Sequence, residues 1–466
     1  MNNHALNLKL MRLSLTLTFL AFTLLIVVVN NRAFAQSSGD YRTATSGNWN
    51  SASTWERYNG SSWVVSPSQG APTSSMGAIT VLNTHTVAVT ANVTLDQVTV
   101  NSGGQLAVNS GVTLIVRNGS GTDLTVSGIV KSAGTINRQG TIVFNSGGKY
   151  QHNFTTTAGT IPTATWNTGS TCEVIGYTSL ATMGNIGLGQ SFYNFTWNCP
   201  NQANTLSMAG GLKTVNGDLS IISTGTGVLQ FANTISSNLT VAVAGDFTQS
   251  GGIFTLLGSS GNSTILTVAG DFTISGGTFQ RGGGTGSVVF NGASVQTFTK
   301  SGSTISGAIN FTVNSGATVD FGTSVLDGSA GTFTLSSGAS IITSHANGLS
   351  STGSIQTTSK SFNSAANYQF KGASTGTFTT TTANTVNNLT INGSGTTLAQ
   401  NFNVNGILSL TSGILTLSTY NLTIASTASI TGFSSSAYIK TNSTGQLKRT
   451  VSSSSVVFFI EKKFCI

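Results

Sequence analysis

Hydrophobic and polar residues alternate in short segments along most of this chain, and Gly, Asn and Ser separate the segments. In the stretch LTVAGDFTIS at residues 266–275, apolar residues alternate with small or polar ones on both sides of a Gly-Asp pair. Such alternation, bounded by turn-forming residues, is typical of β-strands with one buried face. Beyond residue 35 we find no stretch with helical i, i+3, i+4, i+7 spacing, so the sequence predicts an almost entirely β protein.

A repeat organises these strands. VAGDFTQSGGIF at residues 243–254 returns as VAGDFTISGGTF at residues 268–279, and a looser copy, VNGDLSIIST, begins at Val215. A period in the range of about 20–50 residues indicates a solenoid, whereas sandwich domains would repeat at about 100 residues. We therefore predict an all-β, right-handed parallel β-helix over residues 78–450.

Residues 36–77 differ from the rest because they contain Trp49, Trp55 and Trp63 together with several Tyr. A solenoid must cover its first coil, and an atypical aromatic-rich unit is suited to that role. We interpret this region as an N-terminal cap. The alternative is an aromatic platform on which sugars stack.

The first 35 residues have the pattern of a signal peptide. Lys9 and Arg12 precede an apolar run at residues 13–29, and Ala-Phe-Ala at residues 33–35 matches a small-x-small cleavage site. A membrane anchor is the alternative, but the apolar run is at the short limit for a spanning helix. We predict a secreted chain with no membrane span after cleavage.

Charge argues against nucleic acid as a partner. Only 6% of the chain is charged, and without Lys9, Arg12 and Arg32 the formal charge falls from +8 to +5. The remaining basic residues are scattered, without the clustered Lys and Arg that nucleic-acid binding requires.

Three strings, SGNWNSASTW near the start, SFYNFTWNCPNQ at residues 191–202 and NFNVNGILSLTSGILTL at residues 401–417, resemble large secreted surface proteins of Bacteroidetes. Those proteins have repetitive β-helical regions and usually leave the cell by the type IX secretion route, using a C-terminal sorting domain. The resemblance implies a secreted, extracellular or cell-surface location.

The tail departs from that pattern. TNSTGQLKRTVSSSSVVF resembles the family, but FIEKKFCI then ends the chain. We interpret residues 451–466 as an atypical, truncated tail without the sorting domain. Because an uncovered β-edge recruits other strands, we expect self-association through this end, assisted by Cys465.

Candidate chemistry is sparse. Asp218, Asp246 and Asp271 recur at 28 and 25 residues, which places them on successive coils. One interpretation is a turn aspartate that accepts backbone N–H groups, and the other is a carboxylate ladder that holds Ca²⁺. The calcium-binding repeat GGxGxDxUx is absent, so these residues are weak calcium candidates. No other cofactor is indicated.

Cys172 and Cys199 are separated along the chain by close to the length of one coil. Stacked Cα atoms would be near enough for a disulfide, and an exported chain meets an oxidising compartment. The alternative, which the sequence supports equally, is that both residues are buried free thiols in different rows of the core.

No catalytic constellation is recognisable. We therefore predict a secreted or cell-surface structural or adhesive protein, not an enzyme, whose Thr/Ser/Asn-rich rod contacts glycans or cells. The alternative is a β-helical carbohydrate-active enzyme, a polysaccharide lyase or a glycosidase, the latter requiring paired carboxylates.

Overall fold

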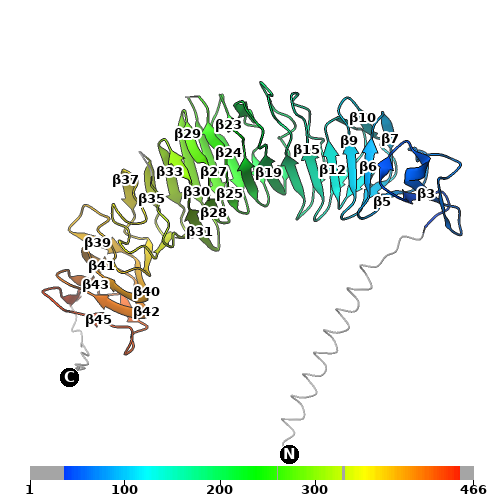
Figure 1. The fold of residues 1–466 in the computed structure, drawn as a ribbon. Coiled ribbons are helices and arrows are strands. Elements are labelled where there is room, and N and C mark those ends of the chain that lie inside the picture. The colour runs from blue at the N-terminus through cyan, green and yellow to red at the C-terminus, as the bar shows by residue number, and fades with distance from the viewer. Residues whose placement is uncertain (1–35, 260, 328–330, 452–466) are drawn as a thin grey trace, which may run out of the picture.

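A computed structural model of the chain describes residues 36–259, 261–327 and 331–451. The polypeptide winds into a β-solenoid of about 16 turns, and its strands stack in parallel on those of the preceding coil. Figure 1 shows an elongated, curved stack that runs from the blue N-terminal coils to the orange C-terminal ones. The predicted all-β parallel β-helix is confirmed. Residues 1–35 and 452–466, which hold the expected signal peptide, Cys465 and nearly all of the expected tail, lie outside the described residues.

A complete coil contributes one strand to each of three faces. β5 (Ile79–Val81), β6 (Thr86–Val89) and β7 (Val93–Leu95) form one such coil, and the next strand, β8 (Val98–Val100), stacks on β5 again. The first face begins with antiparallel pairings of β1 with β3 and of β3 with β4, and is parallel from there on.

The first face consists of three successive sheets. Its strands are β1 (Tyr41–Thr43), β3 (Trp55–Tyr58), β4 (Trp63–Val65), β5, β8, β11 (Leu124–Val126), β14 (Ile142–Phe144) and β16 (Thr165–Trp166); then β18 (Ser191–Phe192), β21 (Thr214–Val215), β24 (Leu239–Val243), β27 (Ser263–Val268), β30 (Thr285–Phe290), β33 (Ile309–Val313), β35 (Thr332–Leu335) and β37 (Ser359–Phe362); then β39 (Ala383–Val386), β41 (Asn401–Val404), β43 (Leu422–Ile424) and β46 (Leu447–Arg449).

The second face is a continuous ladder from the first coil to the last. Its strands are β2 (Gly47–Asn48), β6, β9 (Gln105–Val108), β12 (Ile129–Ser132), β15 (Lys149–His152), β17 (Thr171–Val174), β19 (Asn194–Asn198), β22 (Leu219–Ser223), β25 (Phe247–Gln249), β28 (Phe272–Ile274), β31 (Val295–Lys300), β34 (Thr318–Asp320), β36 (Ser340–Thr343), β38 (Asn367–Phe370), the first halves of β40 (Asn388–Thr397) and β42 (Ile407–Thr416), and β44 (Ser429–Thr431).

The third face has strands in only part of the rod. They are β7, β10 (Thr113–Val116) and β13 (Thr135–Arg138), later β20 (Leu206–Ser207), β23 (Val228–Ala232), β26 (Ile253–Leu257), β29 (Thr278–Gly282) and β32 (Thr304–Ser306), and at the end the second halves of β40 and β42 with β45 (Ile439–Lys440).

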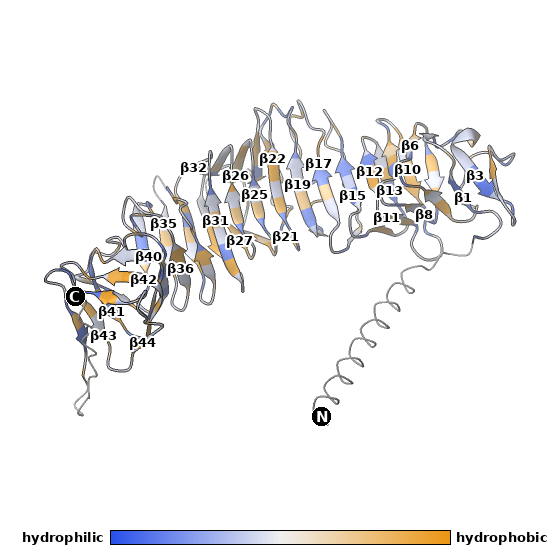
Figure 2. Cartoon of the chain, turned by 60° about the horizontal axis from the view of Figure 1, so that its bottom comes forward, coloured by the Kyte–Doolittle hydropathy of each residue, from blue (hydrophilic) through white to orange (hydrophobic). Residues whose placement is uncertain are grey.

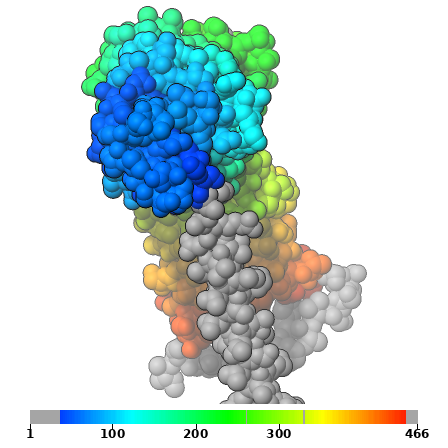
Figure 3. All heavy atoms as spheres, turned by 90° about the vertical axis from the view of Figure 1, so that its right-hand side faces the viewer, coloured from blue at the N-terminus to red at the C-terminus, as the bar shows by residue number. Residues whose placement is uncertain are grey.

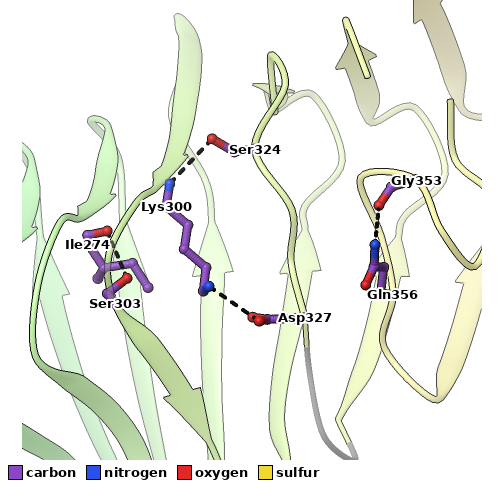
Figure 4. Close-up of polar contacts among 7 residues, drawn as sticks. All are labelled: Ile274, Lys300, Ser303, Ser324, Asp327, Gly353 and Gln356. Atoms are coloured by element: carbon purple, nitrogen blue, oxygen red, sulfur yellow. Dashed lines mark hydrogen bonds and ion pairs between the residues drawn. The ribbon is translucent and has the colours of Figure 1, made fainter. Parts of the chain in front are cut away.

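In the coils that follow β32, loops with the isolated parallel bridges Leu326–Ile355 and Ser374–Thr397 take the place of third-face strands, and side-chain contacts also join neighbouring coils. Lys300 Nζ lies 3.3 Å from Asp327 Oδ2, and the backbone N–H of Lys300 donates to Ser324 Oγ at 3.3 Å (Figure 4). Figure 4 also shows Ser303 bonded to the carbonyl of Ile274 on the preceding coil.

Rows of identical side chains fill the core. Phe247, Phe272 and Phe298 are opposite one another on β25, β28 and β31, with ring centroids 4.9 and 5.7 Å apart along the row. Buried and partly exposed residues alternate along β25 and β28. Figure 2 shows hydrophobic and hydrophilic segments interspersed along the strands of the rod. The two copies of the repeat are stacked in register, because Val243 pairs with Val268 and Phe247 with Phe272.

Residues 36–77 already supply strands to the first coil. β1 pairs with β5 and β2 pairs with β6, both in parallel. Trp49 and Trp55 are buried at this end of the rod, with ring centroids 5.0 Å apart in an edge-to-face arrangement. Figure 3 looks along the rod with these coils nearest the viewer. The aromatic cap stays a prediction.

Candidate functional site

The three repeated aspartates lie on successive coils, at the corner between the first and second faces. Oδ1 of Asp218 accepts the backbone N–H of Asp246 at 2.9 Å, and Oδ1 of Asp246 accepts that of Asp271 at 2.7 Å. Asn194 begins the ladder by accepting from Asp218 N–H, and Asp271 ends it by accepting from Thr297 N–H. Each carboxylate therefore binds its own coil to the next through a backbone hydrogen bond.

The glycine before each aspartate is explained by this ladder. A Cβ on Gly245 would lie 2.2 Å from Oδ1 of Asp218, and one on Gly270 would lie 2.2 Å from Oδ1 of Asp246. No real Cβ approaches an oxygen so closely, so a larger residue would displace the carboxylate. The V-x-G-D motif thus encodes the contact between coils.

The ladder offers little to a calcium ion. Ca²⁺ takes six to eight oxygen ligands, yet one oxygen of each ladder aspartate already accepts a backbone N–H. Across residues 36–259, 261–327 and 331–451, no group of three or more His, Cys, Asp or Glu side chains is arranged to hold a metal.

A carboxyl pair that the sequence analysis did not single out lies on an earlier corner. Asp96 and Asp123 both lie next to Gly119, and Asp123 accepts from the backbone N–H groups of Thr141 and Gly119. Burial raises the pKa of Asp96, and so does the neighbouring Asp123 carboxyl through hydrogen bonding and charge. Burial alone would raise the pKa of Asp123 too, but its hydrogen bonds lower it.

This pair does not have the geometry of a glycosidase. The two carboxyl groups of such enzymes flank the substrate, about 5–9.5 Å apart, whereas these two touch each other. Asp123 is buried and holds the next coil through Thr141, as the ladder aspartates hold theirs. We assign the pair a structural role.

A buried polar network lies inside the coils around β15. The hydroxyl of Tyr150 is 3.2 Å from His152 Nδ1, while His152 Nε2 is 2.8 Å from the carbonyl oxygen of Ala158 and 2.9 Å from the Tyr177 hydroxyl. A neutral imidazole with its proton on Nε2 satisfies all of these contacts. Burial lowers the pKa of His152 to about 4, so the ring is neutral at physiological pH.

Cys172 and Cys199 are both buried and are free thiols in different rows of the core. Cys172 is opposite Phe195, and Cys199 lies four residues further along the chain from Phe195, roughly 13 Å away at strand spacing. The thiol of Cys199 contacts the carbonyl of Val174 instead. The disulfide is therefore absent from the structure, and the alternative of two separate buried thiols describes it.

One aromatic group of the N-terminal region lies at the surface. The guanidinium of Arg42 stacks over the ring of Trp63, 4.2 Å from its centroid, and forms an ion pair with Glu56. Tyr58 packs beside Trp63 with ring centroids 5.3 Å apart. Because Arg42 covers a face of Trp63, that face is not open to a sugar.

A groove of about 870 Å³ lies between β37 and β39, where the first face is interrupted. We call it the β37–β39 groove. Its lining is rich in Ser and Thr, and it contains one cation, Lys360. One feature of the sequence could have indicated this groove. In the strand sequence SKSF, Lys360 occupies an inward position, and the residue opposite it on the preceding coil is Phe333.

Comparison with known proteins found no matching family model, no matching curated protein and no matching solved structure. Among the described residues, none of the helical segments has the length and apolarity needed to span a bilayer.

Proposed function

We propose that this chain is a secreted or cell-surface rod without enzymatic activity, which presents hydroxyl-rich rows to glycans or to other cells. The proposal includes export by the type IX route, on the strength of the resemblance to Bacteroidetes surface proteins. The β-solenoid supports the structural part of it, because stacked coils give a stiff, extended surface rather than a single enclosed pocket.

The observation that carries the proposal is a continuous outward row on the second face. Ser220, Thr248, Thr273 and Thr299 are opposite one another on four successive strands. All four are partly exposed, and the hydroxyl of Thr248 donates to that of Ser220 at 3.0 Å. Neighbouring strands are about 4.8 Å apart, so the row offers hydroxyl groups at a regular spacing.

A row of this kind suits many weak contacts in parallel. One hydroxyl hydrogen bond contributes only about 0.5–1.5 kcal/mol in water, but contacts made by one extended partner add through effective concentration. Polysaccharide chains present repeated hydroxyl groups and are partners of the matching chemistry. Affinity then depends on the length of row that the partner covers.

The test is retention of the purified protein on immobilised polysaccharides and on cells. A triple variant, Thr248→Ala, Thr273→Ala and Thr299→Ala, removes hydroxyls from the row while leaving the inward core untouched. We expect retention to fall roughly tenfold or more if each hydroxyl contributes as above.

The matched control is the triple variant Thr80→Ala, Thr99→Ala and Thr125→Ala, which removes a similar row from the first face. Its retention should fall less. An equal loss of retention in both variants would show that the contact does not depend on the second-face row. If the natural chain is retained on none of the surfaces, the adhesive role is refuted. Turnover of a polysaccharide would establish the enzymatic alternative.

A further inference from the structure

The first face is interrupted between two consecutive coils. β37 is hydrogen-bonded to β35 on one side, and β39 is hydrogen-bonded to β41 on its other side. In the part of the chain that the structure describes, no ladder joins β37 to β39. The second face continues unbroken past the same point, because β38 pairs with β40. Figure 1 shows both strands in the yellow-to-orange part of the stack.

The backbone of both strands points hydrogen-bonding groups into this gap. In a parallel ladder, alternate residues direct their N–H and C=O groups to the same side. Asn363 N–H donates to Leu335 O at 3.1 Å, so Phe362 and Lys360 direct theirs away from β35 and toward β39. These groups form an open strand edge.

The facing edge belongs to β39. Asn405 N–H donates to Val386 O, so the backbone groups of Ala383 and Thr385 point away from β41 and toward β37. The carbonyl oxygen of Ala383 accepts the hydroxyl of Thr381 at 2.7 Å. The other groups of this edge remain available to a ligand in the β37–β39 groove.

The cavity coincides with these two edges. Lys360, Phe362, Ala383 and Thr385 all line the groove, and its volume of about 870 Å³ lies within the usual range of ligand sites. Phe362 packs against Phe378 with ring centroids 5.0 Å apart, which provides an apolar floor.

Lys360 gives the groove its charge. It stands in a core row, directly opposite Phe333, which itself is opposite Phe311. Its side chain is half-buried, and the loss of water around it lowers its pKa. The ion pairs within 4 Å that the described residues form involve Arg42 and three other lysines, and Lys360 takes part in none.

The other interruption of the first face shows how such a gap is sealed. Between β16 and β18, the side-chain oxygen of Gln190 accepts the backbone N–H of Ala164 at 2.9 Å and the indole N–H of Trp166 at 3.0 Å. Its amide nitrogen donates to the carbonyls of Pro162 and Gly187. The β37–β39 groove has a lysine and a row of threonines where the first gap has this glutamine.

We propose that the β37–β39 groove binds an extended polypeptide strand from a partner protein, inserted between the two open edges and carrying a carboxylate side chain opposite Lys360. Strand addition to exposed edges is an established mode of peptide recognition, with backbone hydrogen bonds for affinity and side-chain pockets for specificity. Because Lys360 and Phe362 are two residues apart on the same face, the preferred peptide has an acidic residue and an apolar residue two positions apart.

A peptide fits these observations better than an acidic glycan does. A uronic acid would also pair with Lys360 and with the threonine hydroxyls, but it would leave the backbone donors and acceptors of the two edges without alternating partners. The two strands that border the groove have four residues each, so its edges are roughly 13 Å long. That length matches a short extended peptide.

The experiment measures binding of short fluorescent peptides to the purified protein by anisotropy. The test peptide is a threonine chain with one glutamate and one valine two positions apart. The comparison peptides replace the glutamate by glutamine, or carry N-methyl groups on alternate residues. Lys360→Met removes the charge from the groove, and Lys440→Met is the control at an exposed lysine.

We expect the glutamate peptide to bind the natural chain roughly tenfold more tightly than the glutamine peptide, because a hydrogen bond to a charged group is lost. Lys360→Met should abolish that difference, whereas Lys440→Met should preserve it. N-methylation on the hydrogen-bonding positions should abolish binding. Amide exchange at Lys360, Phe362 and Thr385 should be fast in the free protein and slow in the complex.

Three results would overturn the proposal. Binding that is unaffected by N-methylation would exclude strand addition. Slow amide exchange at the two edges in the free protein would show that the gap is closed. Binding of an oligogalacturonate that is lost in Lys360→Met, with no peptide binding up to about 1 mM, would assign the groove to acidic glycans instead.

Discussion

Acidification should destabilise this rod through His152. Its ring lies among Tyr150, Tyr177 and the Ala158 carbonyl, and each contact is satisfied by the neutral form. Burial lowers the pKa of His152 from its usual 6.5 to about 4 in the folded chain. Because the folded pKa is depressed, the stability that this ring contributes is complete above pH 6.5 and is lost as the pH falls toward 4.

The magnitude follows from the two pKa values. The free energy of unfolding should fall by about 2 kcal/mol at pH 5, and by about 3 kcal/mol below pH 4, from this group alone. Carboxylates also titrate in this range, so a difference between two proteins is required. In His152→Gln the ring is absent but a polar side chain remains, and the carboxylates titrate as before.

The assay is urea unfolding at pH 7 and pH 5, followed by tryptophan fluorescence. Trp197 lies 5.7 Å from the ring of Tyr177 and so reports on this part of the rod. Between the two pH values the natural chain should lose about 2 kcal/mol more than His152→Gln does. His85→Gln, which alters a histidine outside the network, should behave like the natural chain. Equal losses in the natural chain and His152→Gln, or an NMR titration of His152 near pH 6.5, would refute the reasoning.

Four further outcomes follow from contacts between coils and from burial in the core. Gly270→Ala should lower the free energy of unfolding by about 1–3 kcal/mol in urea, because the new Cβ overlaps a carboxylate, whereas Gly189→Ala, which points into open space, should change it little. Asp96→Asn should raise the free energy of unfolding by up to about 1 kcal/mol at pH 7. The pKa of Asp96 is raised in the folded chain, so its ionisation destabilises the fold as the pH rises. The gain from the substitution should therefore vanish below pH 4. Asp123→Asn should instead lower the free energy of unfolding by about 1–3 kcal/mol, because Oδ2 of Asp123 accepts hydrogen bonds from Thr141 on the next coil and Oδ1 accepts one from Gly119. Cys172 should resist thiol reagents until the chain is unfolded, since burial raises the pKa of its thiol well above the usual value, and labelling of the native chain would contradict this.

The strands and the repeat were predictable because both depend on local sequence. Alternation places Phe247 and Phe272 inward, and the identical V-A-G-D-F segments fix their register without knowledge of the rest of the chain. The acceptor role of Asp218 was also within reach, as one of two alternatives, because a turn aspartate has few partners other than backbone N–H groups.

Contacts across coils were less predictable, because coil length varies. Cys172 and Cys199 are as far apart in the sequence as Asp96 and Asp123 are, yet only the aspartates meet. One coil beyond Cys172 the register reaches Phe195, and Cys199 lies further along the same coil. The coil that follows Asp96 is longer, because Val98 pairs with Leu124 on the next coil. The same sequence separation therefore places Asp123 next to Asp96. Sequence distance alone does not supply this local coil length.

In a solenoid each coil contacts only its neighbours, so the strength of the rod at any point is the strength of one interface between coils. Between β37 and β39 that interface has lost its first-face ladder, while the second face retains the pairing of Asn367 with Asn388. Just past β39, Asn387 N–H bonds to Ala366 O, which marks where the two coils meet again. A binding groove and a weak interface are therefore one feature of this fold: the backbone groups that no longer join the coils are the groups that a partner strand would use.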